Sequence, residues 1–271
     1  MTVRPAEPTI LALDFDGVLC EGTPEYYETS RRAYARVWSG APAASDALFP
    51  AFRELRPVIE TGWEMPVLVK GLVDGVPPER MGTAWAATRD TLLGGDGPTR
   101  AALVDRLKTT LDGVRREWIA ADQAGWLAKH RLYCERAELS RVVGEPERTV
   151  IVTTKEGEFA RLILDDWGVA VAGVQGKEAG SHKCDNLREL IAGYETAQGR
   201  MPSLWFVEDR LETLQCVTTH GDLAGVGLFF AGWGYNTERA RDAARRSDRI
   251  RLLTLDQFRA GVAAWPVARG R

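Results

Sequence analysis

Two kinds of hydrophobic periodicity divide the chain. From residue 147 onward, short apolar runs alternate with amphipathic stretches of helical spacing. The apolar runs have the length of buried strands and cover residues 150–153, 169–174, 204–207 and 226–230, with another at residues 10–13. This alternation predicts an α/β fold, a parallel sheet flanked by helices that binds ligands outside the carboxyl ends of its strands.

The long segment between the first and second strands has helical periodicity instead. Apolar side chains recur there at the spacing of one helix face. The two clearest stretches contain Tyr26, Ala33, Tyr34, Val37 and Trp38, and Leu103, Leu107, Leu111, Val114 and Trp118. Breaks rich in glycine and proline occur at residues 74–78 and 94–98. We therefore expect an α/β core of residues 1–21 and 147–271, and an inserted helical domain of residues 22–146.

Two aspartates follow the first predicted strand. Residues two apart on a strand point to the same side, so Asp14 and Asp16 should point together and Phe15 away from them. Neighbouring carboxylates repel, so one must be protonated or a cation must lie between them. The simpler alternative is a strand that ends in a solvated turn, with aspartates favoured beside Gly17.

Hydroxyl groups follow the second predicted strand. Thr153 and Thr154 stand between that strand and an expected helix. A hydroxyl beside the free N–H groups of a starting helix can bind phosphate. A threonine at this place can equally serve only to cap the helix.

Charged residues mark two more segments. Lys177 and Lys183 lie in a polar loop that opens a helix, where either ammonium group could neutralise phosphoryl oxygens. Glu208 and Asp209 end the predicted strand at residues 204–207, and carboxylate oxygens in such a place suit Mg²⁺. Glu208 and Asp209 could instead stand there because acidic residues are favoured at a helix N-terminus. This alternative does not explain why acidic residues end two separate strands.

The order of these four segments resembles the signature motifs of the haloacid dehalogenase (HAD) superfamily. The resemblance covers about half of the chain, and residues 226–236 also resemble the strand and glycine loop that close phosphoglycolate-phosphatase-like members. It implies a Rossmann-like parallel-sheet core with a helical cap domain inserted after the first motif. The cap would select the substrate and the core would supply the chemistry.

The resemblance also implies a role for each motif residue. Asp14 would be the nucleophile that forms an aspartyl-phosphate, and Asp16 the general acid and base. Thr153 would bind the transferring phosphoryl group. Lys183 would balance its charge, with Lys177 as the second candidate for this role.

Mg²⁺ is the implied cofactor. Its implied ligands are the carboxylate of Asp14, the backbone carbonyl of Asp16, Glu208 and Asp209. The other candidate substrate-binding residues are Thr154, Gly17 and Lys177.

The resemblance implies an enzyme, a phosphatase that hydrolyses a small phosphorylated metabolite. The second aspartate, Asp16, favours phosphate ester hydrolysis because the dehalogenases of the superfamily lack it. Two alternatives stay open: a phosphomutase of the same superfamily, and a non-catalytic protein that binds a phosphorylated ligand or a partner protein. The crowded carboxylates count against the second, because a pure binding module gains nothing from them.

Composition narrows the partners and the location. The net charge of −3, from 35 basic and 38 acidic residues, does not indicate binding to nucleic acid or to an anionic membrane surface. No segment approaches the roughly 20 apolar residues that span a bilayer. The four cysteines and three histidines are too scattered for a zinc site or a disulfide framework, so we expect reduced thiols in a cytoplasmic protein: Cys20, Cys134, Cys184, Cys216, His130, His182 and His220.

Overall fold

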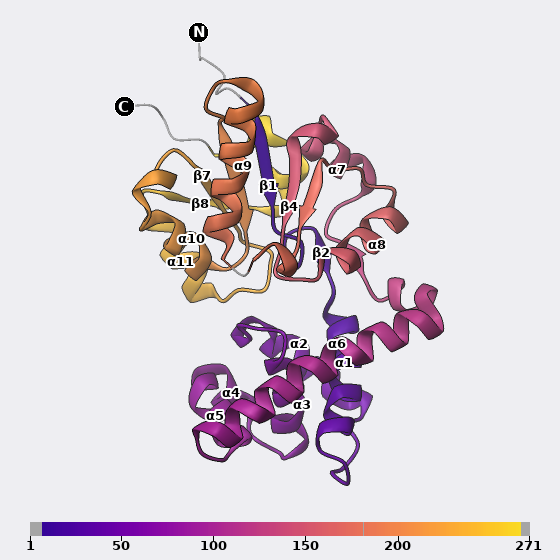
Figure 1. The fold of residues 1–271 in the computed structure, drawn as a ribbon. Helices are drawn as coiled ribbons and strands as arrows, with labels where there is room; N and C mark the ends of the chain where they lie inside the picture. The colour runs from indigo at the N-terminus through magenta and orange to yellow at the C-terminus, as the bar shows by residue number, and fades with distance from the viewer. Residues whose placement is uncertain (1–6, 181, 267–271) are drawn as a thin grey trace. The chain divides into compact units, whose positions relative to one another are not determined.

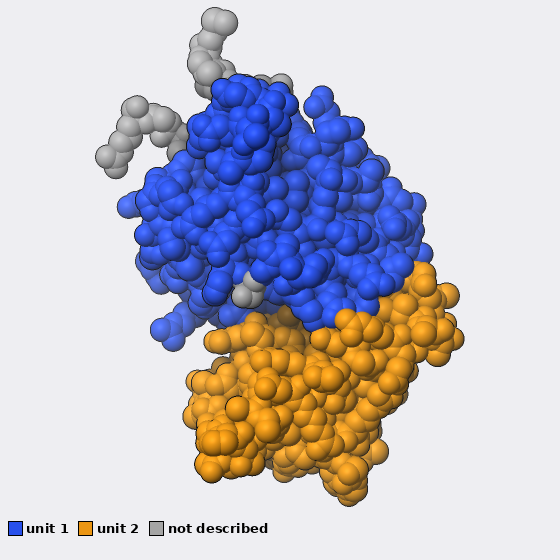
Figure 2. Space-filling view, in the orientation of Figure 1, with its two compact units in different colours: residues 1–21, 131–271 blue, residues 22–130 orange. Residues whose placement is uncertain are grey.

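The chain folds into two compact units in the computed structural model, which describes residues 7–180 and 182–266. Unit 1 comprises residues 1–21 and 131–271, and unit 2 comprises residues 22–130 (Figure 2). The sequence predicts an insertion of residues 22–146, whereas unit 2 ends at residue 130, so the second boundary is corrected.

Residues 131–146 belong to unit 1 because of two contacts. Strand β3 (Arg131–Leu132) pairs antiparallel with β2 (Cys20–Glu21). Helix α7 (Arg136–Val143) packs against α12 (Leu255–Arg259), where Arg259 donates a hydrogen bond of 2.6 Å to the carbonyl of Tyr133. An amphipathic helix such as α7 does not reveal from its sequence alone which unit it packs on.

Unit 1 is built on a six-stranded parallel sheet, which confirms the α/β prediction (Figure 1). In spatial order its strands are β5 (Gly173–Gln175), β4 (Thr149–Val152), β1 (Ile10–Leu13), β6 (Leu204–Glu208), β7 (Gly227–Ala231) and β8 (Ile250–Leu253). Strand β5 begins at Gly173, later than the apolar run at 169–174 predicts. The edge strand β8 was not predicted.

Helices cover both faces of this sheet, which is why its central strands are continuous apolar runs. On one face, Ile10, Ala12 and Phe206 form a core with α9 (Lys183–Gln198), α10 (Leu211–Thr218) and α11 (Glu238–Arg245). On the other face, the rings of Trp205 and Phe229 lie against Trp265, which in turn stacks on Phe258 of α12. The remaining elements of unit 1 are α8 (Gly157–Trp167) and the short 3-10 helices η3 (Pro146–Arg148), η4 (Lys177–Ala179), η5 (Gly221–Leu223) and η6 (Val262–Ala264).

The described elements of unit 2 are all helices, as the periodicity predicts. They are α1 (Thr23–Val37), η1 (Asp46–Leu48), α2 (Phe49–Leu55), η2 (Arg56–Val58), α3 (Glu64–Val73), α4 (Pro78–Thr83), α5 (Trp85–Leu93) and α6 (Gly97–Leu127). The predicted breaks separate α3 from α4 and α5 from α6. Helix α6 is itself interrupted at Asp122, whose backbone is not helical. No helix in the described part of the chain is long and apolar enough to cross a membrane.

A buried ion pair joins the two long helices of unit 2. Arg115 of α6 donates hydrogen bonds of 2.7 and 3.3 Å to the carboxylate of Glu25 on α1. Thr29 and the indole of Trp126 donate to the same carboxylate, at 2.6 and 3.2 Å. Because a buried charge is costly unless it is paired and hydrogen-bonded, this network ties α1 to α6 in one arrangement.

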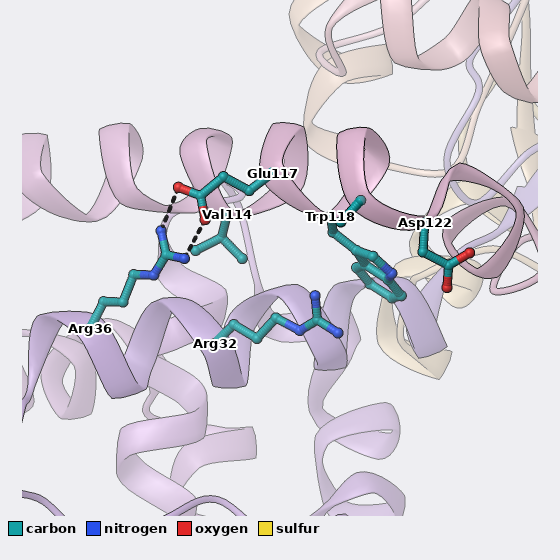
Figure 3. A pocket seen from close by; sticks show the side chains of 7 residues that line it. Arg32, Arg36, Val114, Glu117, Trp118 and Asp122 are labelled. Atoms are coloured by element: carbon teal, nitrogen blue, oxygen red, sulfur yellow. Dashed lines mark hydrogen bonds and ion pairs between the residues drawn. The ribbon is translucent and has the colours of Figure 1, made fainter.

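A shallow pocket of about 410 Å³ lies between the same helices (Figure 3). It is lined by Arg32, Arg36, Val114, Glu117, Trp118, Ala121 and Asp122. The Arg32 guanidinium lies 4.3 Å from the centre of the Trp118 ring and also pairs with Glu28 at 2.6 Å. Arg36 pairs with Glu117. Carboxylates of unit 2 therefore already neutralise both guanidinium groups.

Candidate active site

The sheet brings the predicted motif residues of unit 1 together at the carboxyl ends of its central strands. Strand β1 lies between β4 and β6, and because all three are parallel their carboxyl ends meet. Asp14 directly follows β1, and its N–H donates to the carbonyl of Val207 at 2.9 Å. Thr153 directly follows β4, and Glu208 is the last residue of β6.

Lys183 connects two of these carboxylates. Its ammonium nitrogen Nζ lies 2.8 Å from Oδ1 of Asp14 and 2.5 Å from Oε2 of Glu208. All three side chains are almost completely buried. Lys177, the other candidate, has an exposed side chain whose Nζ lies 2.8 Å from Oε1 of Glu156. Of the two lysines, the structure places Lys183 at the aspartate.

The donor atoms of this site fit a hard divalent cation. Asp14, Glu208 and Asp209 each offer a carboxylate oxygen, and these oxygens lie within 4.8 Å of one another. Burial raises the pKa of Asp14 to about 7 and also raises the pKa of Glu208, although Lys183 opposes both shifts. A bound cation would favour the ionised carboxylates. An all-oxygen donor set of this kind suits Mg²⁺.

Glu208 and Asp209 differ in how the protein already holds them. Oε2 of Glu208 accepts from Lys183, and Oε1 accepts from the N–H of Arg210 at 3.0 Å. Oδ2 of Asp209 accepts from the N–H of Tyr235 at 2.6 Å. Glu208 therefore fixes the lysine, while Asp209 is fixed by the glycine loop that follows β7.

Two glycines allow that loop and the first motif to approach Asp209 closely. Gly17 has a φ of +89°, and a Cβ atom there would lie 2.0 Å from Oδ2 of Asp209. A Cβ atom at Gly234 would lie 2.3 Å from Cβ of Asp209. Position 17 therefore requires glycine for two reasons: its backbone is left-handed, and a side chain there would overlap Asp209.

Replacing Gly17 by alanine should lower the free energy of unfolding by about 3 kcal/mol, from backbone strain and overlap with Asp209 together. Gly40→Ala is the matched control, because Gly40 has a φ of +91° and no atom within 4 Å of an added Cβ. It should cost only about 1 kcal/mol. Urea unfolding of both variants measures the difference, and equal losses would show that the close approach is unimportant.

Comparison with known proteins gives the fold. No protein-family model matches the sequence, and no curated protein matches it either. Among solved structures, a protein assigned as a phosphoglycolate phosphatase from Lactobacillus delbrueckii subsp. bulgaricus is similar, with a TM-score of 0.57 and 10% identity over 94% of this chain and 98% of that one. A protein with the same assignment from Haemophilus somnus is similar with a TM-score of 0.56 and 15% identity, over 92% of this chain and 96% of that one.

A third similar structure belongs to a haloacid dehalogenase-like family. It is a haloacid dehalogenase-like hydrolase family protein from Streptococcus pneumoniae, with a TM-score of 0.50 and 13% identity over 90% of this chain and 94% of that one. The chain has the haloacid dehalogenase fold. Sequence identities this low show the shared HAD fold and leave activity to be argued from the site.

Asp16 has a partner that the sequence analysis did not assign. In this HAD fold, Oδ2 of Asp16 lies 3.3 Å from Nζ of Lys155, whose side chain is only 4% exposed. Oδ1 of Asp16 is buried and has no hydrogen-bond partner among residues 7–180 and 182–266. Buried polar atoms are normally hydrogen-bonded, and a protonated Oδ1 could donate to an oxygen that enters the site. The clue to Lys155 is its place three residues after the end of β4 at Val152, but loop lysines are usually solvated.

The two threonines of the second motif have different environments. Thr153 is buried, and its Oγ1 accepts from the N–H of Lys155 at 3.1 Å. Thr154 is exposed. Neither one caps α8, whose N-cap residue is Glu156. The capping alternative is therefore excluded for both.

Proposed function

We propose that the protein is a Mg²⁺-dependent phosphatase that hydrolyses a small phosphomonoester through a phosphorylated Asp14. The observation that supports this best is the buried contact of Lys183 with Asp14 and Glu208, beside Asp16 and Asp209. A carboxylate held by a cation at the strand ends of a HAD fold is placed to attack an electrophile that enters this edge. The phosphatase assignments of similar structures agree with the proposal.

The first step forms a bond between a carboxylate oxygen of Asp14 and phosphorus, and breaks the bond between phosphorus and the ester oxygen. Asp16 gives its proton to that departing oxygen, which leaves as an alcohol. Lys183 and Thr153 contact the phosphoryl oxygens and offset their charge. Splitting the displacement into two steps makes each one easier.

The second step releases phosphate. Asp16, now ionised, takes a proton from water while the water oxygen attacks phosphorus and the bond to Asp14 breaks. The products are inorganic phosphate and the original enzyme. Mg²⁺ held by Asp14, Asp209, Glu208 and the Asp16 carbonyl would supply positive charge to the phosphoryl group.

Free phosphate is the product that tests this proposal. Purified protein should release it from a chromogenic phosphomonoester with Mg²⁺, and a chelator should stop the release. A phosphomutase would form the same phosphorylated aspartate but return the group to a sugar, so a bisphosphorylated sugar in place of free phosphate would support that alternative. No turnover of any phosphomonoester in a broad panel would contradict the phosphatase.

Lys183→Met should lower kcat by about 10²- to 10³-fold, because it removes a preorganised charge at the reacting group. Lys177→Met should stay within about twofold of wild type, since Lys177 pairs with Glu156 at the surface. Steady-state assays compare the two variants, and thermal unfolding shows whether each is folded. A larger loss of kcat for the Lys177 variant would show that Lys177, and not Lys183, acts at the phosphoryl group.

Mg²⁺ should stabilise the wild-type protein, because it relieves repulsion among Asp14, Glu208 and Asp209 in the folded state only. At a Mg²⁺ concentration 100 times the Kd, the expected gain is about 2.7 kcal/mol. Asp209→Asn should remove most of this gain, while Asp165→Asn, at an exposed position on α8, should keep it. Thermal unfolding with and without Mg²⁺ measures it, and an equal gain in both variants would place the cation elsewhere.

A further inference from the structure

Two cysteines and a histidine, which are potential soft metal ligands, lie together in unit 1, and Cys184 is far in sequence from the other two. Sγ of Cys184 lies 3.8 Å from Sγ of Cys216, which in turn lies 4.0 Å from Nε2 of His220. All three atoms lie within 4.8 Å of one another. The spacing of the cysteines and histidines in the sequence predicts no cluster, but the packing of the helices brings these three side chains together.

The fold explains this convergence. Cys216 lies on α10 and His220 four residues later, just beyond its C-terminus, so both project to one side. Cys184 is the second residue of α9, which packs against α10 through Leu187 and Leu214. Cys184 itself is buried, whereas Cys216 is exposed. The cluster therefore has a buried side and a side that solvent can reach.

We propose that Cys184, Cys216 and His220 bind a zinc-class divalent cation at a site separate from the carboxylates. Two thiolates on one tetrahedral Zn²⁺, each at about 2.3 Å, lie about 3.8 Å apart. The observed separation of the two sulfur atoms is 3.8 Å. Two thiols and an imidazole form a soft donor set, which selects zinc-class metals over Mg²⁺.

A disulfide does not account for the cluster. A disulfide needs its sulfur atoms at about 2.05 Å, and both cysteines are free. Hydrogen-bond contacts between the two sulfur atoms at 3.8 Å and between Sγ of Cys216 and Nε2 of His220 at 4.0 Å hold the reduced cluster together, so its three donor atoms are already assembled for a cation. Three protein ligands leave one tetrahedral position, which the exposed side of the cluster opens to water.

Metal binding has a cost and a structural consequence. Burial raises the pKa of the Cys184 thiol to about 11, so a bound cation must displace the protons of both thiols to the solvent. Cys184 directly follows Lys183, which contacts Asp14. A cation at the cluster would thus clamp the first turn of α9 to the end of α10 and hold the residue next to Lys183 in place.

Co²⁺ is the probe that distinguishes the two sites. Full-length protein, kept reduced and saturated with Mg²⁺ to occupy the carboxylates, is titrated with Co²⁺. Binding at the cluster should give a thiolate-to-cobalt charge-transfer band at one equivalent, and Zn²⁺ should abolish it. Because carboxylates cannot produce this band, the result does not depend on phosphatase activity.

Variants test the ligands individually. Cys216→Ser and His220→Ala should each weaken Zn²⁺ binding by at least about 100-fold, the upper range for loss of groups that merely support a ligand. Cys134→Ser and His182→Ala, outside the cluster, should bind as the wild type does. Competition with a zinc indicator dye measures all four, and Mg²⁺-dependent thermal stabilisation checks that each variant is folded.

Two results would overturn the proposal. One is the absence of the charge-transfer band in the reduced wild-type protein, whether or not oxidation then joins Cys184 to Cys216. The other is unchanged Zn²⁺ affinity in both Cys216→Ser and His220→Ala. In the first case a disulfide found by mass spectrometry would identify the pair as a redox couple and not a metal site.

Discussion

Asp14→Asn should reduce phosphomonoester hydrolysis by at least about 10⁴-fold, because an amide of nearly the same shape cannot act as the nucleophile. Losses of this size are typical when one member of a catalytic unit is removed. Phosphate release with saturating Mg²⁺ measures the effect. Acid quench of the wild-type reaction should trap a phosphorylated protein that the variant does not form.

The free energy of unfolding of the same variant should depend on pH differently from that of the wild type. Burial raises the pKa of Asp14 from its ordinary 3.8 to about 7, so the folded state binds a proton there more tightly than the unfolded state. Its contribution to stability is therefore present at low pH and lost as pH rises from about 4 to about 7. At pH 8 without divalent cations, Asp14→Asn should be at least as stable as wild type.

The matched control for this position is Asp165→Asn, which makes the same chemical change at an exposed site on α8. It should keep wild-type turnover and stability. Near-normal turnover of Asp14→Asn would show that another group is the nucleophile. A folded variant with no turnover and no phosphoenzyme is the result that the site predicts.

Arg115→Met should lower the free energy of unfolding by about 3 to 5 kcal/mol, because it leaves the Glu25 carboxylate buried without its guanidinium partner. Methionine keeps much of the side-chain volume, so the loss reports mainly charge. Urea unfolding followed by tryptophan fluorescence measures it, since Trp126 donates to the same carboxylate.

Arg36→Met is the control for this prediction. Arg36 and Glu117 also join α1 to α6, but their side chains are 49% and 61% exposed. Exposed ion pairs contribute no more than about 1 kcal/mol. If both variants lost the same stability, burial would not explain the importance of the Glu25 pair.

Short-range patterns were enough to predict the centre of unit 1. The runs at residues 10–13 and 204–207 are apolar at every position because helices cover both faces of the sheet. Parallel pairing then places their following residues, Asp14 and Glu208, at one edge. Three of the four motifs, those of Asp14, Thr153 and Glu208, lie at strand ends, whereas the motif of Lys183 opens a helix.

What the sequence analysis missed depends on contacts between distant segments. Strand β8 lies at the edge of the sheet and carries Arg251, which stacks on the Phe229 ring at 5.7 Å, so its sequence is not a continuous apolar run. Lys155 resembles any loop lysine until Asp16 is placed beside it. Cys184 and Cys216 come together only through the packing of α9 on α10.

The antiparallel pairing of β2 and β3 brings together the two points where the inserted segment leaves and re-enters unit 1. Glu21, the last residue before the insertion, pairs with Arg131, the first residue after it. Closing a longer or shorter loop between such fixed ends costs only about 0.6 kcal/mol for each doubling of its length. Because this pairing fixes both ends, the length of the segment between them has little effect on the closure of unit 1 around β1.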